Sequence, residues 1–359
     1  MKSQVRTLAL PSNSYDLNGT VTYELSFIDR FMGLIQRLPA PYWLTLLLLF
    51  VLQSALTHAL AWIDGWLTAY TFSPLLLLFP GWLWGPIGIM IHLNSTSIEA
   101  LSSFRPLLSI DEEGVARLKR EFTTMPARSV ILNAVFWSTL YAILWAVSYD
   151  TVTVTFGTGP LLTAALIVEG LVSFSIGSAI YYHSVRQLRL VNRTVQMVEQ
   201  VNLFQLEPAY AFSRLTARTG IAWIVLLSLS LLTYPMTAAN AGSLAIYVLQ
   251  VVLALAAFVL PLRFVNYQLV AEKRKLVAEL DQRVEQTLAR LHRALDASDM
   301  SGMDQLNDAI AVLNAERDIL TKIPTWPWHA GTLPKFLSAV ALPIVLFLIQ
   351  FVIEKWLSG

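Results

Sequence analysis

The sequence contains no cysteine and few charged residues. The absence of cysteine excludes disulfide bonds, thiolate catalysis and cysteine-based metal sites. Only 14% of the 359 residues are charged, and their near balance leaves a net charge of +1, which gives no basis for binding nucleic acid. Hydrophobic residues make up 55% of the chain, and the mean hydropathy is +0.57. This composition is far more apolar than that of a soluble domain and predicts an integral membrane protein.

Sequence motifs of nucleotide binding, hydrolysis and zinc catalysis are also missing. The chain has no GxxxxGK(S/T), no GxGxxG after a predicted strand, no GxSxG and no HExxH. Its five histidines include no pair at the i, i+4 spacing of a helical zinc site. The sequence therefore predicts no catalytic residues, no metal site and no cofactor. The first residues, MKSQVRTLALPSNSYD, lack the long apolar core of a cleaved secretory signal, so we expect the mature chain to begin near Met1.

Long apolar segments are the main feature that is present. A helix needs about 17 to 25 apolar residues to cross the hydrocarbon core of a bilayer. Seven segments reach this length: residues 43–62, 72–94, 130–148, 160–183, 219–235, 243–265 and 336–354. The sequence thus predicts an all-α polytopic membrane protein with seven transmembrane helices. We divide it into an N-terminal segment at 1–42, a six-helix region at 43–265 with loops at 95–129 and 184–218, a helical hairpin and Pro/Trp linker at 266–335, and a final helix at 336–359.

The distribution of basic residues predicts how the chain lies in the membrane. Of the 25 Lys and Arg residues, 24 fall before the first span, in 95–129, in 184–218 or between Arg263 and Lys335. The short connections 63–71, 149–159 and 236–242 contain none. Because basic loops stay in the cytoplasm, we expect a multi-pass protein of the cell membrane with a cytoplasmic N-terminus and an outer C-terminus.

A short motif recurs before the odd-numbered spans. LPAP occupies 38–41, MPAR 125–128, LTAR 215–218 and LPKF 333–336. The first three copies are 87 and 90 residues apart, which predicts three tandem helical hairpins followed by a single seventh helix. Proline is common near the start of a helix, so a generic helix-start signal is the alternative interpretation.

The segment between the sixth and seventh spans predicts a cytoplasmic antiparallel hairpin of the coiled-coil type. Val270, Val277, Val284 and Leu291 recur every seven residues along a helix that continues from span six. After the turn DASDMSG, residues 303–322 provide a return helix with an apolar face of its own. Either the two helices pack on each other within one chain, or they form an intersubunit bundle that holds a homo-oligomer together. Besides the lipid bilayer, a cytoplasmic protein that binds 267–322 is therefore a candidate partner.

Polar side chains occur near the middle of several spans. Glu169 lies roughly 13 Å from the outer end of span four, where a carboxylate needs protein or water beside it. Gln53, Tyr141 and Gln250 lie at comparable depth, and His58 lies slightly nearer the outside. One hypothesis is that these five side chains form a polar layer for ions, protons or a substrate. The alternative is an interhelical hydrogen-bond clamp, helped by small neighbouring residues that let helices approach closely.

Span two contains an irregular centre, FPGWLWGPIG. Pro80, Gly81, Gly85 and Pro86 weaken a helix there, because proline lacks a backbone donor and glycine is flexible. A broken helix next to a cavity or gate is one interpretation. A proline kink packed against its neighbours is the other.

Three classes of function remain open. An ion channel or transporter that uses the polar layer around Glu169 is the preferred hypothesis, and the missing nucleotide motif argues only against primary active transport by this chain alone. A signalling or scaffold protein acting through the cytoplasmic hairpin is the alternative. An intramembrane enzyme would need two convergent acids, or a histidine with an acid, at one depth, and only Glu169 with His58 approaches this pattern.

Overall fold

The structure is almost entirely helical, as the sequence predicts. It is a computed structural model that describes residues 23–150, 159–198, 203–204, 206–233, 241–297, 302–328 and 331–358. Within these ranges, extended pairing is limited to a single bridge between Leu25 and Pro126. The all-helical fold class predicted from the sequence is therefore confirmed for the described chain.

Seven helices are long and apolar enough to cross a membrane, which confirms the predicted number among the described residues. They are built on α2 (Tyr42–Ile63), α3 (Leu78–Phe104), α5 (Ala127–Val147), α7 (Pro160–Gly177), α9 (Ala211–Thr233), α10 (Ala241–Val259) and α13 (Thr332–Ser358). A 3₁₀ turn, η1 (Pro74–Leu77), precedes α3. Helix α3 continues well past the predicted boundary at residue 94, because the chain has no proline or glycine between Ile89 and Phe104. This is the organisation of a multi-pass membrane protein.

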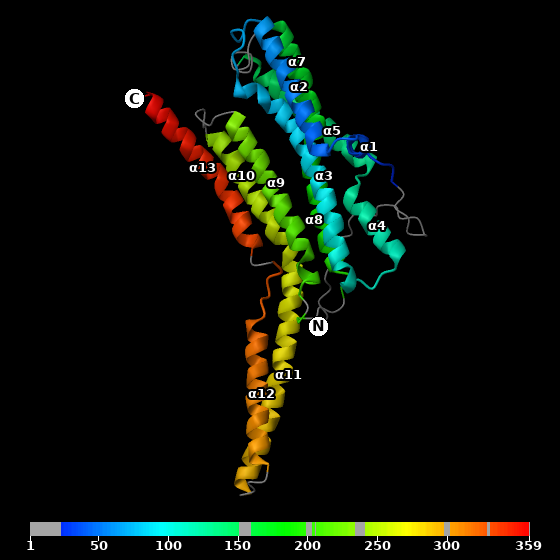
Figure 1. The fold of residues 1–359 in the computed structure, drawn as a ribbon, viewed down its shortest axis with the longest axis vertical. Coiled ribbons are helices and arrows are strands. Elements are labelled where there is room, and N and C mark those ends of the chain that lie inside the picture. Colours follow the sequence, from blue (N-terminus) through cyan, green and yellow to red (C-terminus); the bar gives the residue numbers. More distant parts are fainter. Residues whose placement is uncertain are drawn as a thin grey trace, which may run out of the picture.

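Helix α3 is central to the membrane region. It packs against α2, α7 and α9. Helix α5 lies beside α7, whereas α10 and α13 lie beside α9. Figure 1 shows the group of α9, α10 and α13 leaning away from the group of α2, α5 and α7 at the upper end of the molecule. Neighbours in the chain therefore pair as α2 with α3, α5 with α7 and α9 with α10, although their origin as tandem repeats stays a prediction.

A long helical hairpin projects from the membrane region (Figure 1). Helix α11 (Arg263–Asp296) follows α10 after the 3₁₀ turn η5 (Leu260–Leu262), and α12 (Met303–Lys322) packs back along it. The four residues of the predicted heptad face are all half-buried: Val270, Val277, Val284 and Leu291. Leu280, between them, is 2% exposed. We call α11 and α12 the arm, and the side of the membrane region from which they project the arm side; the cytoplasmic location of the arm stays a prediction.

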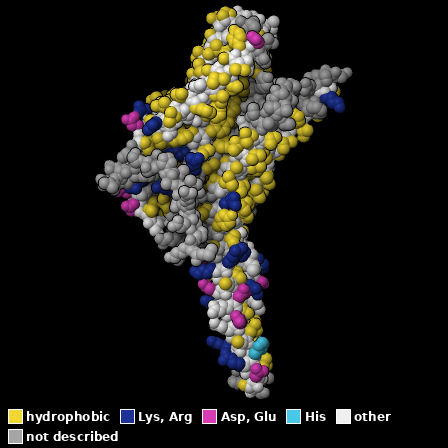
Figure 2. Space-filling model, turned by 180° about the vertical axis from the view of Figure 1, so that it is seen from behind, with side chains coloured by type: hydrophobic (Ala, Val, Ile, Leu, Met, Phe, Trp, Pro, Cys, Tyr) yellow, Lys and Arg dark blue, Asp and Glu magenta, His cyan; other side chains and the backbone are white. Residues whose placement is uncertain are grey.

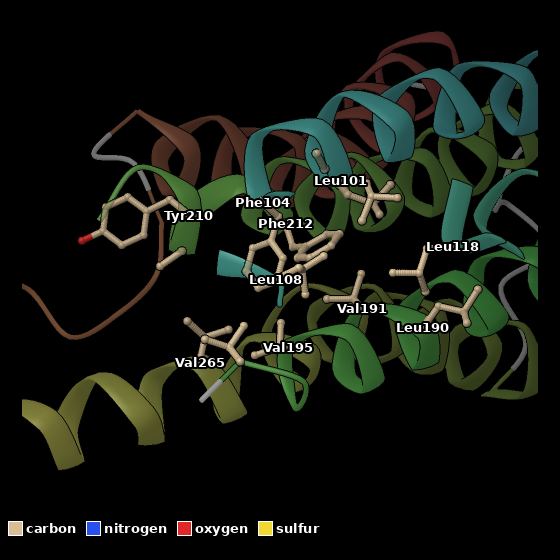
Figure 3. Close-up of a cluster of buried hydrophobic side chains, with 14 of the residues drawn as sticks. Leu101, Phe104, Leu108, Leu118, Leu190, Val191, Val195, Tyr210, Phe212 and Val265 are labelled. Carbon is tan, nitrogen blue, oxygen red and sulfur yellow. The ribbon is translucent and has the colours of Figure 1, made fainter. Parts of the chain in front are cut away.

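A large apolar core lies where the arm joins the membrane region (Figure 3). There the ends of α3 and α9 meet α8 (Ala179–Val195), α4 (Glu112–Thr123) and the first turns of α11. The rings of Phe104 and Phe212 lie 4.8 Å apart at its centre, and burial of each such side chain contributes about 2 to 3 kcal/mol. Because α11 places Val265 and Leu269 in the same core, the base of the arm is anchored to four other helices.

Polar and apolar side chains are separated along the molecule. On the face drawn in Figure 2, hydrophobic side chains cover the upper, spanning part, while Lys, Arg, Asp and Glu gather toward the arm and along it. Helix α1 (Phe27–Arg37), which precedes α2, is amphipathic and buries Ile28, Met32 and Ile35. This separation matches a membrane protein whose ionic groups stay in water.

Candidate functional site

Glu169 lies between α7, which carries it, and α2. The hydroxyl group of Thr57 donates a hydrogen bond of 2.6 Å to Glu169 Oε1. The side chain of Gln53, one turn earlier on α2, interacts with the same carboxyl group. Glu169 is half-buried, and its Oε2 atom is enclosed by protein without a well-formed hydrogen bond. Polar contacts thus join α2 and α7 at a depth where lipid hydrocarbon offers none.

The hydrogen bonds of Thr57 can follow the protonation state of Glu169. Thr57 Oγ1 lies 2.6 Å from Glu169 Oε1 and 3.0 Å from the backbone oxygen of Gln53, but a hydroxyl group has only one hydrogen to donate. When Glu169 is ionised, Thr57 donates to the carboxylate. When Glu169 is protonated, the carboxyl group can donate to Thr57, which then donates to the backbone oxygen. The contact is satisfied in both states.

Trp84 of α3 connects a third helix to this cluster. Its indole Nε1 donates a hydrogen bond of 2.7 Å to Gln53 Oε1. Because this bond engages the amide oxygen, the NH₂ group of Gln53 is free to face Glu169. Sequence reasoning missed both Thr57 and Trp84. Thr57 could have been predicted, because it lies four residues after Gln53 and hence on the same helix face. Trp84 lies on a different helix, and no sequence pattern indicated that it contacts Gln53.

Tyr141 of α5 packs against the same turn of α7. Its hydroxyl group donates a hydrogen bond of 3.0 Å to the backbone oxygen of Leu166. Its ring lies directly against Gly170, where a Cβ atom has no room. Tyr141 therefore borders the residue next to Glu169, with its polar atom satisfied by the backbone of α7.

His58 and Gln250 have other surroundings. His58 Nδ1 lies 2.7 Å from the backbone oxygen of Ser54, and the backbone N–H of Ser73 donates to His58 Nε2 at 3.2 Å. These partners assign a neutral ring with its proton on Nδ1. Gln250 is half-buried on α10, which packs against α9. Of the residues in the predicted layer, the structure brings Gln53 and Tyr141 to the turn that carries Glu169, and it uses His58 to join α2 to η1.

The irregular stretch of span two is helical in the structure. Helix α3 is continuous from Leu78 to Phe104 and contains Pro86. Pro86 has no N–H for the backbone oxygen of Trp82, its acceptor four residues earlier. The α-carbon of Gly177 packs against that oxygen and leaves no room for a Cβ atom. Pro80, Gly81, Gly85 and Pro86 therefore lie in an unbroken helix that crosses α7 closely, and a gate at these residues stays a prediction.

A second buried polar group lies on the arm side, and sequence reasoning missed it. Asn94 Oδ1 accepts hydrogen bonds from His183 Nε2 at 2.7 Å and from Gln187 Nε2 at 3.2 Å. The amide group of Asn94 donates to the backbone oxygen of Thr123 at 3.1 Å. These bonds tie α3 and α8 to the end of α4. Among the residues that the structure describes, no three His, Asp or Glu side chains are grouped as metal ligands.

No protein-family model, curated protein or solved structure matches the chain. The feature of the molecule that bears most directly on function is a carboxyl group within the membrane region, in contact with Thr57 and Gln53 of one helix and linked through Gln53 to Trp84 of another.

Proposed function

We propose that this membrane protein is an ion channel or transporter in which Glu169 binds a proton or cation on its way across the membrane. The contact between Thr57 and Glu169 supports the proposal, because it has a hydrogen-bond arrangement for the protonated and the ionised carboxyl group. An ionisable side chain at this depth is costly, and it commonly marks an ion or proton path.

A hydrogen-bond clamp is the competing explanation, and Glu169→Gln separates the two. Glutamine keeps the size of the side chain and an oxygen that accepts from Thr57, but it cannot release or bind a proton. A clamp survives this substitution, whereas a titrating site does not. Thr57→Ser keeps the hydroxyl group and Thr57→Val removes it at nearly the same volume, which gives a second matched pair.

The test is proton and monovalent-cation flux through the purified protein in liposomes. We expect flux in the wild type, a loss of at least about tenfold in Glu169→Gln and Thr57→Val, and near wild-type flux in Thr57→Ser. Glu112→Gln is the control acid, because the Glu112 side chain is 90% exposed and lies at the start of α4. All variants must first match the wild type in size-exclusion chromatography and in unfolding. Equal flux in Glu169→Gln and the wild type, or no flux under any gradient, contradicts the proposal.

A signalling or scaffold role is the second candidate, supported by the attachment of the arm. Val265 and Leu269 of α11 share one core with α3, α8 and α9, so a displacement of those helices moves the arm. The chain has no cysteine, and a single cysteine in place of Lys275, whose side chain is 63% exposed, is a unique label. Under this proposal the cysteine reacts with a membrane-impermeant maleimide only after the cell membrane is permeabilised. The same cysteine also crosslinks to a soluble protein. Labelling of intact cells rejects the cytoplasmic arm.

A further inference from the structure

An apolar groove of about 560 Å³ runs along α3 between α2 and α9. Gly81, Gly85 and Gly88 of α3 are among its lining residues, and there is room beside Gly85, where a Cβ atom would meet only Leu226 Cδ2 at 3.7 Å. Phe50 of α2 and Val225 of α9 are among the apolar residues of its two walls. The groove is open on the side that points away from the protein, so in a membrane it faces lipid.

The groove extends through the depth of one membrane leaflet. Tyr42 and Arg218 line its arm-side end, and Leu229 lines the other. Leu229 lies eleven positions after Arg218 on α9, a length of about 16 Å at 1.5 Å per residue. Half of a hydrocarbon core of about 30 Å is nearly the same length. The hollow thus spans the space that one acyl chain occupies between the interface and the bilayer centre.

Arg218 supplies a positive charge at the interfacial end of the groove. One of its terminal nitrogens donates a hydrogen bond of 2.6 Å to Thr96 Oγ1. The carboxylate of Glu99 is 4.0 Å away and is largely exposed. A guanidinium group has five N–H donors, and the Arg218 side chain is 37% exposed, so donors remain for an incoming anion. An apolar slot that ends at an exposed arginine matches an acyl chain that ends at a phosphate.

We propose that this groove binds one membrane phospholipid, with an acyl chain along the glycines of α3 and its phosphate group at Arg218. The lipid site does not depend on transport by Glu169, and either proposal can fail alone. The two sites are nevertheless adjacent, because Trp84 lines the groove and also donates a hydrogen bond to Gln53. A bound acyl chain therefore packs beside the side chain that orients the amide of Gln53.

Native mass spectrometry of the delipidated full chain tests the site with two probes. One is phosphatidylglycerol, and the other is diacylglycerol with the same acyl chains but no phosphate. Gly85→Phe fills the groove. Gly85→Ala is its matched control, because a Cβ atom at residue 85 meets only Leu226 Cδ2 at 3.7 Å, an ordinary contact. Arg218→Gln removes the charge and leaves the apolar slot.

The wild type and Gly85→Ala should each retain one tightly bound phosphatidylglycerol, and Gly85→Phe should lose it. Arg218→Gln should bind phosphatidylglycerol about tenfold more weakly, which equals about 1.4 kcal/mol, while its affinity for diacylglycerol stays that of the wild type. Retention of the lipid by a folded Gly85→Phe protein overturns the site. Unchanged phosphatidylglycerol affinity in Arg218→Gln overturns the headgroup assignment. A dimer that Gly85→Phe dissociates identifies a second copy of the chain as the occupant and also refutes the lipid proposal.

Discussion

The crossing of α3 and α7 predicts a large effect for the smallest substitution of Gly177. In Gly177→Ala the new methyl group would overlap the backbone oxygen of Trp82. This oxygen cannot swing aside as a flexible side chain does, so the two helices must separate. Overpacking costs about 1 to 3 kcal/mol, and a backbone obstacle places this case near 3. Alanine regains about 1 kcal/mol through its higher helix propensity, which leaves a net destabilisation of about 2 kcal/mol.

Unfolding of the purified protein in mixed micelles, followed by the helical circular dichroism signal, measures this loss. Gly33→Ala is the matched control, because Gly33 lies inside α1 and a Cβ atom there has no neighbour within 4 Å. It should stabilise the protein by about 0.5 to 1 kcal/mol through helix propensity. If both substitutions raise stability alike, the close contact between Gly177 and Trp82 does not exist in solution and the description of the crossing is wrong.

Two further predictions concern the arm side and the arm. Burial raises the pKa of Asp29 above its usual 3.8 despite hydrogen bonds from Met125 and Ser26. The folded protein then binds this proton more tightly than the unfolded chain, so the stabilisation is present below about pH 3.8 and is lost as the pH rises through the folded pKa. As the pH rises from about 4 to 7, the unfolding midpoint of the wild type should fall relative to that of Asp29→Asn. A constant difference between the two midpoints over this pH range contradicts the prediction. In the arm, Lys273 Nζ donates to the backbone oxygens of Thr321 at 2.7 Å and Ile323 at 2.8 Å. Lys273→Met should weaken the end of α12 by about 1 kcal/mol and speed its hydrogen exchange, whereas Lys275→Met should not; equal exchange in both variants argues against this role.

The spans were predictable because their signals are local, and the heptad face, which stays a prediction, rests on a local signal of the same kind. A run of apolar residues sets the length of α2 or α9 without reference to any other helix, and the seven-residue period around Val277 marks one face of α11. Burial of Leu280 on that face agrees with the period. The depth of Glu169 also follows from counting residues along one helix.

The neighbours of Glu169 were less predictable, because they depend on how each helix is rotated and on which helix lies beside it. Gln53 and His58 have similar depth on α2, yet Gln53 turns toward Glu169 while His58 bonds to Ser54 and Ser73. The continuity of α3 likewise depends on a contact with a neighbouring helix. The oxygen that Pro86 leaves without a helical donor meets Gly177, a residue that lies 91 positions away. No window of the sequence around Pro86 contains that information.

Helix α7 therefore has two interfaces of different kinds. Toward α3 it presents the backbone of Gly177 and the hydroxyl group of Ser173, which donates to the backbone oxygen of Phe79 at 2.9 Å. This close packing of α7 on α3 allows a single arrangement of the two helices. Toward α2 it presents Glu169, whose hydrogen bond with Thr57 has two arrangements that depend on one proton. If Glu169 is a titrating site, Gly177→Ala should lower stability without shifting the pH dependence of flux, and Glu169→Gln should abolish the pH-dependent flux with a smaller change in stability. Loss of both properties in both variants would instead make α2, α3 and α7 one cooperative unit in which Glu169 is only a clamp.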